Sequence, residues 1–223
     1  VTYIDNGFLS YNEQISSVDL PMVSSIGSRF LSNAKDLVSI NLPLVERVSN
    51  KFLYNNKSLT SIDLPSIRTI GDEFLYSNYD LSKINIPSAR VIGDDFLYYN
   101  QSLKTIDLPS VLDIGRQFMY ENKSLSKINL PMVSSIGSKF LKYNESLTSI
   151  DFPSVQSIGS GFLFFNVSLE SINLPSVLDI NHEFLYGNES LKTLKLPKVV
   201  TIGDDFLHYN DSLTTLELPK LNQ

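Results

Sequence analysis

The amino-acid sequence predicts a repeat solenoid of about ten coils, each 22 residues long. Successive prolines are always 22 residues apart, at Pro21, Pro43, Pro65, Pro87, Pro109, Pro131, Pro153, Pro175, Pro197 and Pro219. A phenylalanine stands nine residues after each of the first nine prolines, and an apolar–polar–apolar triplet stands directly before every proline. A fixed period of this length is typical of repeat proteins, in which a unit buries its apolar side chains only by stacking on its neighbours.

The elements of one unit follow in order along the segment 62–76. The alternation Ile62-Asp63-Leu64 predicts a short strand with one buried face, and Pro65 ends it because proline has no N–H to donate. The pair Ile70-Gly71 predicts a bend that needs either positive φ or a close approach of two backbones. Phe74-Leu75-Tyr76 then predicts a short return segment, such as a single helical or 3₁₀ turn. The phenylalanine column is expected to be the spine, since each buried Phe contributes about 1.5–3 kcal/mol.

The consensus of these units is N-x-S-L-x-x-I-x-L-P-x-V-x-x-I-G-x-x-F-L. It resembles the BspA-like, or Treponema-type, leucine-rich repeats, which typically carry C-x-x-L-x-x-I-x-I-P-x-x-V-x-x-I-G-x-x-A-F in about 23 residues. The resemblance covers essentially the whole chain, although this unit is one residue shorter and has Asn where the family often has Cys. It implies a right-handed leucine-rich-repeat superhelix with short parallel β-strands on one face and short 3₁₀ or helical turns or loops on the other. A parallel β-helix is the alternative, because a 22-residue coil with asparagine columns suits that fold too.

Composition narrows the classes of partner. A net charge of −6 and a pI near 4.9 disfavour nucleic acid and anionic membrane surfaces. The absence of cysteine excludes disulfides and thiolate metal sites, and no apolar run is long enough to insert into a membrane.

Residues 1–223 are expected to form a single solenoid. Because the chain opens and closes in mid-repeat, we expect a fragment of a longer protein whose uncapped ends can associate end to end.

The exposed residue in the middle of each predicted strand alternates between Asp and Asn over eight units. Carboxylates on adjacent parallel strands would repel by nearly 0.9 kcal/mol in water, and an intervening Asn relieves this. One interpretation is therefore a solvated face without a partner, and the other is a polar ladder that binds a ligand. On the second interpretation the strand face would bind through eight residues: Asp63, Lys83, Asn85, Lys104, Asp107, Lys127, Asn129 and Asp151. Carboxylates standing in a line suit neither calcium nor glycosidase chemistry.

Two further columns have a structural and a functional interpretation. The triplet Asn-x-Ser recurs in seven units, as in Asn56-Lys57-Ser58, which is an N-glycosylation signal in secreted eukaryotic proteins. Asn12 and Asn78 keep the Asn without the Ser, which favours a structural amide that bonds to loop backbone groups from coil to coil.

Tyrosines follow the Phe-Leu pair in five units, where they either pack on the next coil or form a binding surface. They are Tyr54, Tyr76, Tyr98, Tyr120 and Tyr186.

No catalytic, cofactor-binding or metal-binding residues are predicted, because His182 and His208 stand at unrelated repeat positions without partners at ligand spacing. The sequence therefore predicts no enzyme and no cofactor. The family resemblance implies a non-enzymatic protein–protein or protein–glycan interaction module, namely a cell-surface adhesin repeat whose partner is a host matrix component or another cell. It would be extracellular or on the cell surface, attached to the cell wall through segments outside this sequence. The alternatives are a passive stalk or spacer, and a cytoplasmic interaction scaffold.

Overall fold

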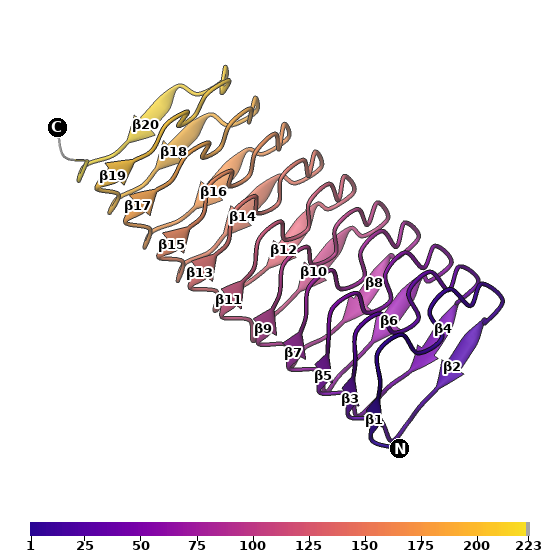
Figure 1. Cartoon of the computed structure of the whole chain (residues 1–223). Coiled ribbons are helices and arrows are strands. Elements are labelled where there is room, and N and C mark those ends of the chain that lie inside the picture. Colours follow the sequence, from indigo (N-terminus) through magenta and orange to yellow (C-terminus); the bar gives the residue numbers. More distant parts are fainter. Residues whose placement is uncertain (222–223) are drawn as a thin grey trace.

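The computed structural model describes residues 1–221 as a parallel β-solenoid in which successive coils stack into one long pile (Figure 1). The N-terminal and C-terminal coils lie at opposite ends of the pile. Described residues form only strands, turns and irregular segments, without a helix. The predicted solenoid and its 22-residue period are confirmed. For the side of the coil opposite the strands, the expectation was either loops or short helical or 3₁₀ turns. The described residues form loops there, and the expectation of a helical or 3₁₀ turn is wrong.

One face of each coil is a three-residue strand that ends two residues before the proline. We call this surface the ladder face. Its strands are β2 (Ser17–Asp19), β4 (Ser39–Asn41), β6 (Ser61–Asp63), β8 (Lys83–Asn85), β10 (Thr105–Asp107), β12 (Lys127–Asn129), β14 (Ser149–Asp151), β16 (Ser171–Asn173), β18 (Thr193–Lys195) and β20 (Thr215–Glu217). Each strand begins and ends one residue earlier than predicted, so that in β6 the inward Ile62 is the middle residue and the exposed Asp63 is the last one. The alternation of buried and exposed residues read from the sequence is confirmed.

A second face carries two-residue strands where the sequence predicted a bend. We call it the sheet face. Its strands are β1 (Tyr3–Ile4), β3 (Ser25–Ile26), β5 (Arg47–Val48), β7 (Thr69–Ile70), β9 (Val91–Ile92), β11 (Asp113–Ile114), β13 (Ser135–Ile136), β15 (Ser157–Ile158), β17 (Asp179–Ile180) and β19 (Thr201–Ile202). The odd-numbered strands from β1 to β15 form one continuous parallel sheet in steps of 22 residues, and β17 pairs with β19.

The ladder face is divided differently. Its strands pair two by two, as β2–β4, β6–β8, β10–β12, β14–β16 and β18–β20, and Figure 1 shows this grouping along the pile. Within a pair the ladder is complete, and Leu64 N–H then donates to Asn85 C=O at 2.9 Å just beyond it. Between β4 and β6 no backbone hydrogen bond is formed in the described chain. The face is therefore a row of two-stranded ribbons separated by open intervals.

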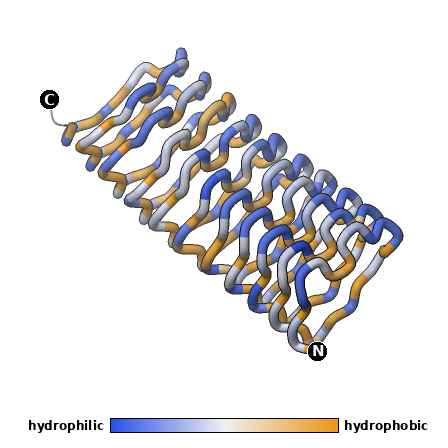
Figure 2. Tube along the Cα trace, viewed as in Figure 1, coloured by the Kyte–Doolittle hydropathy of each residue, from blue (hydrophilic) through white to orange (hydrophobic). Residues whose placement is uncertain are grey.

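The phenylalanine column runs through the core, as predicted. Rings from Phe30 to Phe184 are at most 1% exposed. Consecutive rings, from Phe8 to Phe206, stack with centroids 5.1–5.8 Å apart and planes within 4–13° of parallel. Figure 2 shows that hydrophobic residues recur at the same places in every coil. The column thus links each unit to the next through its largest apolar side chain.

The third side of the coil, the loop face, replaces the predicted helical turn. Every second residue in it has positive φ, as at Glu73 (55°), Leu75 (51°) and Ser77 (57°). This alternation turns the N–H of Leu75 to the previous coil and those of Glu73 and Ser77 to the next, so that they bond to Phe52, Asp94 and Tyr98 at 2.8–2.9 Å. Each left-handed residue costs roughly 1–2 kcal/mol. The hydrogen bonds between loops of adjacent coils offset this cost. A helical turn could not form them, because its N–H groups would bond within the same coil.

The glycine column marks the corner between the sheet face and the loop face. These glycines do not have positive φ; instead, a Cβ on Gly115 would lie 2.6 Å from the backbone of Gly93 in the previous coil. Of the two reasons predicted for glycine here, close backbone approach is confirmed and positive φ is wrong.

Candidate functional site

All eight residues predicted to bind a ligand are exposed on the ladder side of the molecule. Seven of them are the outer residues of strands β6, β8, β10, β12 and β14, and Lys104 directly precedes β10. The strands hold them in register, with Asp63 opposite Asn85 and Asp107 opposite Asn129. Asp151 lies further along, opposite Asn173.

The Asp/Asn alternation has a direct structural cause. In each of four ribbons the Asn side chain donates Nδ2–H to the Asp carboxylate of its partner strand at 2.8 Å, in the pairs Asp19–Asn41, Asp63–Asn85, Asp107–Asn129 and Asp151–Asn173. Each amide bonds only to the Asp that precedes it, because the open interval separates it from the next one. In the fifth ribbon an ion pair between Lys195 and Glu217 at 2.7 Å takes the same place.

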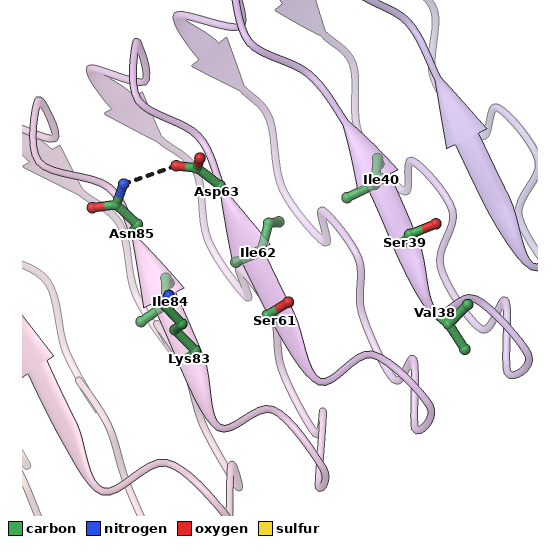
Figure 3. Close-up of a pocket in the computed structure, with 9 residues that line it drawn as sticks. All are labelled: Val38, Ser39, Ile40, Ser61, Ile62, Asp63, Lys83, Ile84 and Asn85. Atoms are coloured by element: carbon green, nitrogen blue, oxygen red, sulfur yellow. Dashed lines mark hydrogen bonds between the residues drawn. The ribbon is translucent and has the colours of Figure 1, made fainter.

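Two shallow hollows on this face contain six of the eight predicted residues. The first, drawn in Figure 3, is lined by Asp63, Lys83 and Asn85 together with residues 38–40 and 61–62 and Ile84. The second is lined by Asp107, Lys127 and Asn129 with Thr105 and Ile106. Lys104 and Asp151 lie outside both. The first hollow extends over the open interval between β4 and β6, where the exposed Val38 forms part of the wall.

Ion pairs involve only a minority of the cations in residues 1–221. Four lysines pair with an acid one coil away, as Lys51 does with Glu73 at 3.3 Å and Lys123 with Glu145 at 2.8 Å. Within residues 1–221, Lys83, Lys104 and Lys127 form no ion pair. Their ammonium groups are therefore available to an anionic or hydroxyl-bearing ligand, beside carboxylate and amide groups that still have unused acceptor atoms.

The asparagine column is structural, as the residues suggested. Asn56, Asn100 and Asn122 are fully buried. Asn122 donates Nδ2–H to the C=O of Leu97 at 2.8 Å and accepts the N–H of Asn100 at 3.1 Å. A glycan attached to an amide with no exposed surface would have to displace the neighbouring coil. The folded protein therefore cannot carry glycans at these fully buried Asn-x-Ser sites.

The tyrosine column packs on itself. The rings of Tyr54, Tyr76, Tyr98 and Tyr120 stack with centroids 4.6–4.9 Å apart. Burial raises the pKa of Tyr76 to about 12 and also raises that of Tyr98. Because each ring covers the face of the next, the stack leaves no ring face free along its length for a sugar to lie on. This column is better suited to stabilising the coils than to binding.

One lysine extends the same column. Lys142 stands where other coils have Tyr, and its Nζ lies 3.5 Å from the centre of the Phe164 ring. Burial lowers the pKa of Lys142. The contact has the geometry of a cation–π interaction and continues the packing of the column.

The histidines remain apart from any cluster. His182 lies 3.2 Å from the carboxylate of Asp204, and His208 stacks on the Tyr186 ring with centroids 5.2 Å apart. Across residues 1–221, no group of three or more His, Asp or Glu side chains is placed to hold a metal ion.

A family model described as the BspA type leucine rich repeat region matches residues 2–122 and 113–223, with six copies of the repeat. The chain belongs to this family. The resemblance read from the consensus is therefore confirmed over the whole repeat array. A comparison with curated proteins gave no match.

Three solved bacterial structures share the fold. A leucine-rich-repeat protein from Bacteroides ovatus is 20% identical with a TM-score of 0.63, and the match covers 97% of this chain and 70% of that one. A leucine-rich-repeat protein from Eubacterium ventriosum is 16% identical with a TM-score of 0.57, covering 100% and 86%. A leucine rich cell surface protein from Faecalibacterium prausnitzii is 17% identical with a TM-score of 0.51, covering 97% and 83%. At these identities the likeness establishes the fold alone. In residues 1–221 no helix is long and apolar enough to cross a membrane.

Proposed function

We propose that the chain is a non-enzymatic binding module of a bacterial surface protein, and that it binds a protein or glycan partner through the ladder face. The observation that carries this proposal is the coincidence of the two hollows with Asp63, Lys83, Asn85, Asp107, Lys127 and Asn129. The loop face supports a binding role less well, since the tyrosine and asparagine columns are occupied by contacts between coils. The cell-surface description of the Faecalibacterium structure supports an adhesin role outside the cell.

The test is binding of the purified chain to immobilised matrix proteins, mucins and glycans at two salt concentrations. The variant Asp63→Asn/Asp107→Asn/Asp151→Asn removes three charges from the ladder face while each new amide can still accept a hydrogen bond from its Asn partner. The control Asp5→Asn/Asp113→Asn/Asp179→Asn changes the net charge equally at exposed positions in or next to strands of the sheet face. Saturable binding whose affinity changes in the first variant and not in the control supports the proposal. Binding that both variants retain would move the site to another face.

A passive spacer is the second candidate function. It is favoured by the unbroken phenylalanine column, which joins every coil to the next and makes bending at a single coil costly. Absence of binding to every member of the panel, together with a rod that keeps its length in solution scattering, would support this function instead.

A further inference from the structure

The two hollows repeat the same set of side chains. Lys83-Ile84-Asn85 in β8 and Lys127-Ile128-Asn129 in β12 have identical sequences, and each Asn bonds to an Asp of its partner strand at 2.8 Å. Each hollow therefore offers one unpaired ammonium, one carboxylate oxygen and one amide. The two sets lie 44 residues apart, which is two coils, or about 10 Å along the pile.

The strand residues around these sets are hydrophilic. On the ladder strands from β2 to β16 all outward residues are Ser, Thr, Lys, Asp or Asn, and the exposed apolar Val38 lines the first hollow just before β4. Protein–protein interfaces are enriched at their centres in aromatic residues and Met. A ligand rich in hydroxyl groups matches this face better than a polypeptide, since adjacent carboxylate and amide groups can accept from and donate to neighbouring hydroxyls.

We infer that the ladder face binds an acidic polysaccharide that carries a carboxylate on every second sugar and lies along the pile, with Lys83 and Lys127 each facing one carboxylate. Two coils advance by about 10 Å, which is close to the length of an extended disaccharide. The Asp–Asn pairs would then bind hydroxyl groups of the sugars between the charged ones. This inference rests on the proposed binding role of the ladder face and adds the class of ligand.

The repeat of two coils between Lys83 and Lys127 allows a matched test. Ser171 lies a further two coils on, 44 residues after Lys127, next to the Asp151–Asn173 pair. Ser149 is exposed on the preceding strand, one coil out of phase. Ser171→Lys and Ser149→Lys therefore add the same charge to the same face, one coil apart. Both are made in the Glu170→Gln background, because the Glu170 side chain lines the same hollow as Ser171.

The probe is an oligosaccharide of four glucuronic acid–N-acetylhexosamine units, measured by calorimetry and compared with a neutral glucan and with polyglutamate. Lys83→Met/Lys127→Met is expected to weaken binding at least 10-fold, as expected for losing charge-assisted hydrogen bonds. Ser171→Lys is expected to tighten binding several-fold through a third contact in register, and Ser149→Lys to have a clearly smaller effect. Circular dichroism checks that every variant retains the wild-type fold.

Equal gains from the two added lysines would overturn the inference, because general charge attraction would explain them. Polyglutamate or the neutral glucan binding as tightly as the probe would overturn it too. If no acidic glycan binds but a panel partner does, and the Lys83→Met/Lys127→Met variant loses that partner, the ladder face remains the binding site and only the ligand class is wrong. If nothing binds at all, both proposals fail.

Discussion

Replacing Asn122 by Ala tests whether the asparagine column holds the coils together. The side chain donates to Leu97 C=O at 2.8 Å and to Tyr120 C=O at 3.2 Å, and it accepts the N–H of Asn100 at 3.1 Å. The Ala variant leaves the buried Leu97 C=O and Asn100 N–H without these partners. Each buried unsatisfied group costs about 1–3 kcal/mol, so we expect a loss of about 3 kcal/mol in the free energy of unfolding.

Asn144 is the matched comparison within the same column. It donates to Met119 C=O at 2.9 Å and weakly to Lys142 C=O at 3.4 Å, but its Oδ1 accepts no hydrogen bond in the structure. Asn144→Ala should therefore cost about 1 kcal/mol less than Asn122→Ala, the contribution of one hydrogen bond.

Urea unfolding of both variants and the wild type, followed by circular dichroism, measures this difference. Hydrogen exchange at the amide of residue 100 separates local opening from global unfolding, because long repeat arrays need not unfold in one step. Asn122→Ala should accelerate exchange at that amide, whereas Asn144→Ala should not. A loss below about 1 kcal/mol for Asn122→Ala would refute the assignment of a structural role to the column.

Four other changes test the fold. Phe96→Ala removes a fully buried ring between Phe74 and Phe118 and should cost about 3–5 kcal/mol, whereas Phe8→Ala in the exposed first coil should cost clearly less in the same urea experiment. Gly115→Ala should destabilise by about 1–3 kcal/mol because its Cβ would lie 2.6 Å from the backbone of Gly93, and thermal melting measures this. At Lys139, with φ of 60°, a β-branched Val should cost about 1–2 kcal/mol while Gly should be near neutral, since Gly161 occupies the same place in the next coil; equal effects of the two would contradict the left-handed assignment. Finally, burial raises the pKa of Tyr76 to about 12, so between pH 10 and about pH 12 the folded chain keeps a proton that the unfolded chain has lost. The free energy of unfolding should therefore be unaffected by this group below pH 10 and should decline between pH 10 and about pH 12, less steeply in Tyr76→Phe.

The sequence predicted the period, the inward and outward residues of the ladder strands and the buried columns, because each of these repeats at a fixed interval. It did not predict the strands of the sheet face, since two residues such as Thr69 and Ile70 are too few to show an alternation. It also failed at the loop face. Non-glycine residues such as Leu75 carry no local signal for positive φ, and the hydrogen bonds that stabilise that conformation come entirely from adjacent coils.

The candidate site was predictable as a row of residues but not as two separate places. All eight residues lie exposed on the expected side, and six of them gather in the hollows. The sequence did not indicate that Val38 and the unpaired strand edge at the interval between β4 and β6 would form part of the first hollow. That interval depends on the spacing of whole coils, which no single unit encodes. The repeated Lys-Ile-Asn triplet at 44 residues was the signal that could have shown the phase.

The spacing of the coils explains why the ladder face is divided into pairs. Equivalent rings keep the same orientation from coil to coil, so their centroid distance measures the local advance. That advance is 5.1–5.8 Å at the phenylalanines inside. It exceeds the spacing of about 4.8 Å between hydrogen-bonded strands, which is consistent with a ladder face whose strands pair two by two.

In this arrangement the strands on either side of every second interval are hydrogen-bonded, and the strands on either side of the remaining intervals are not. An Asn can reach an Asp only across a closed interval, so the chain places Asp on the first strand of each ribbon and Asn on the second, as in Asp63–Asn85 and Asp107–Asn129. Alternation of the two residue types along the sequence thus follows the alternation of the intervals. For a ligand bound along this face, the repeating unit is therefore two coils rather than one. Comparing Ser171→Lys, which lies two coils after Lys127, with Ser149→Lys, which lies one coil after it, tests both the binding proposal and the pairing of the strands.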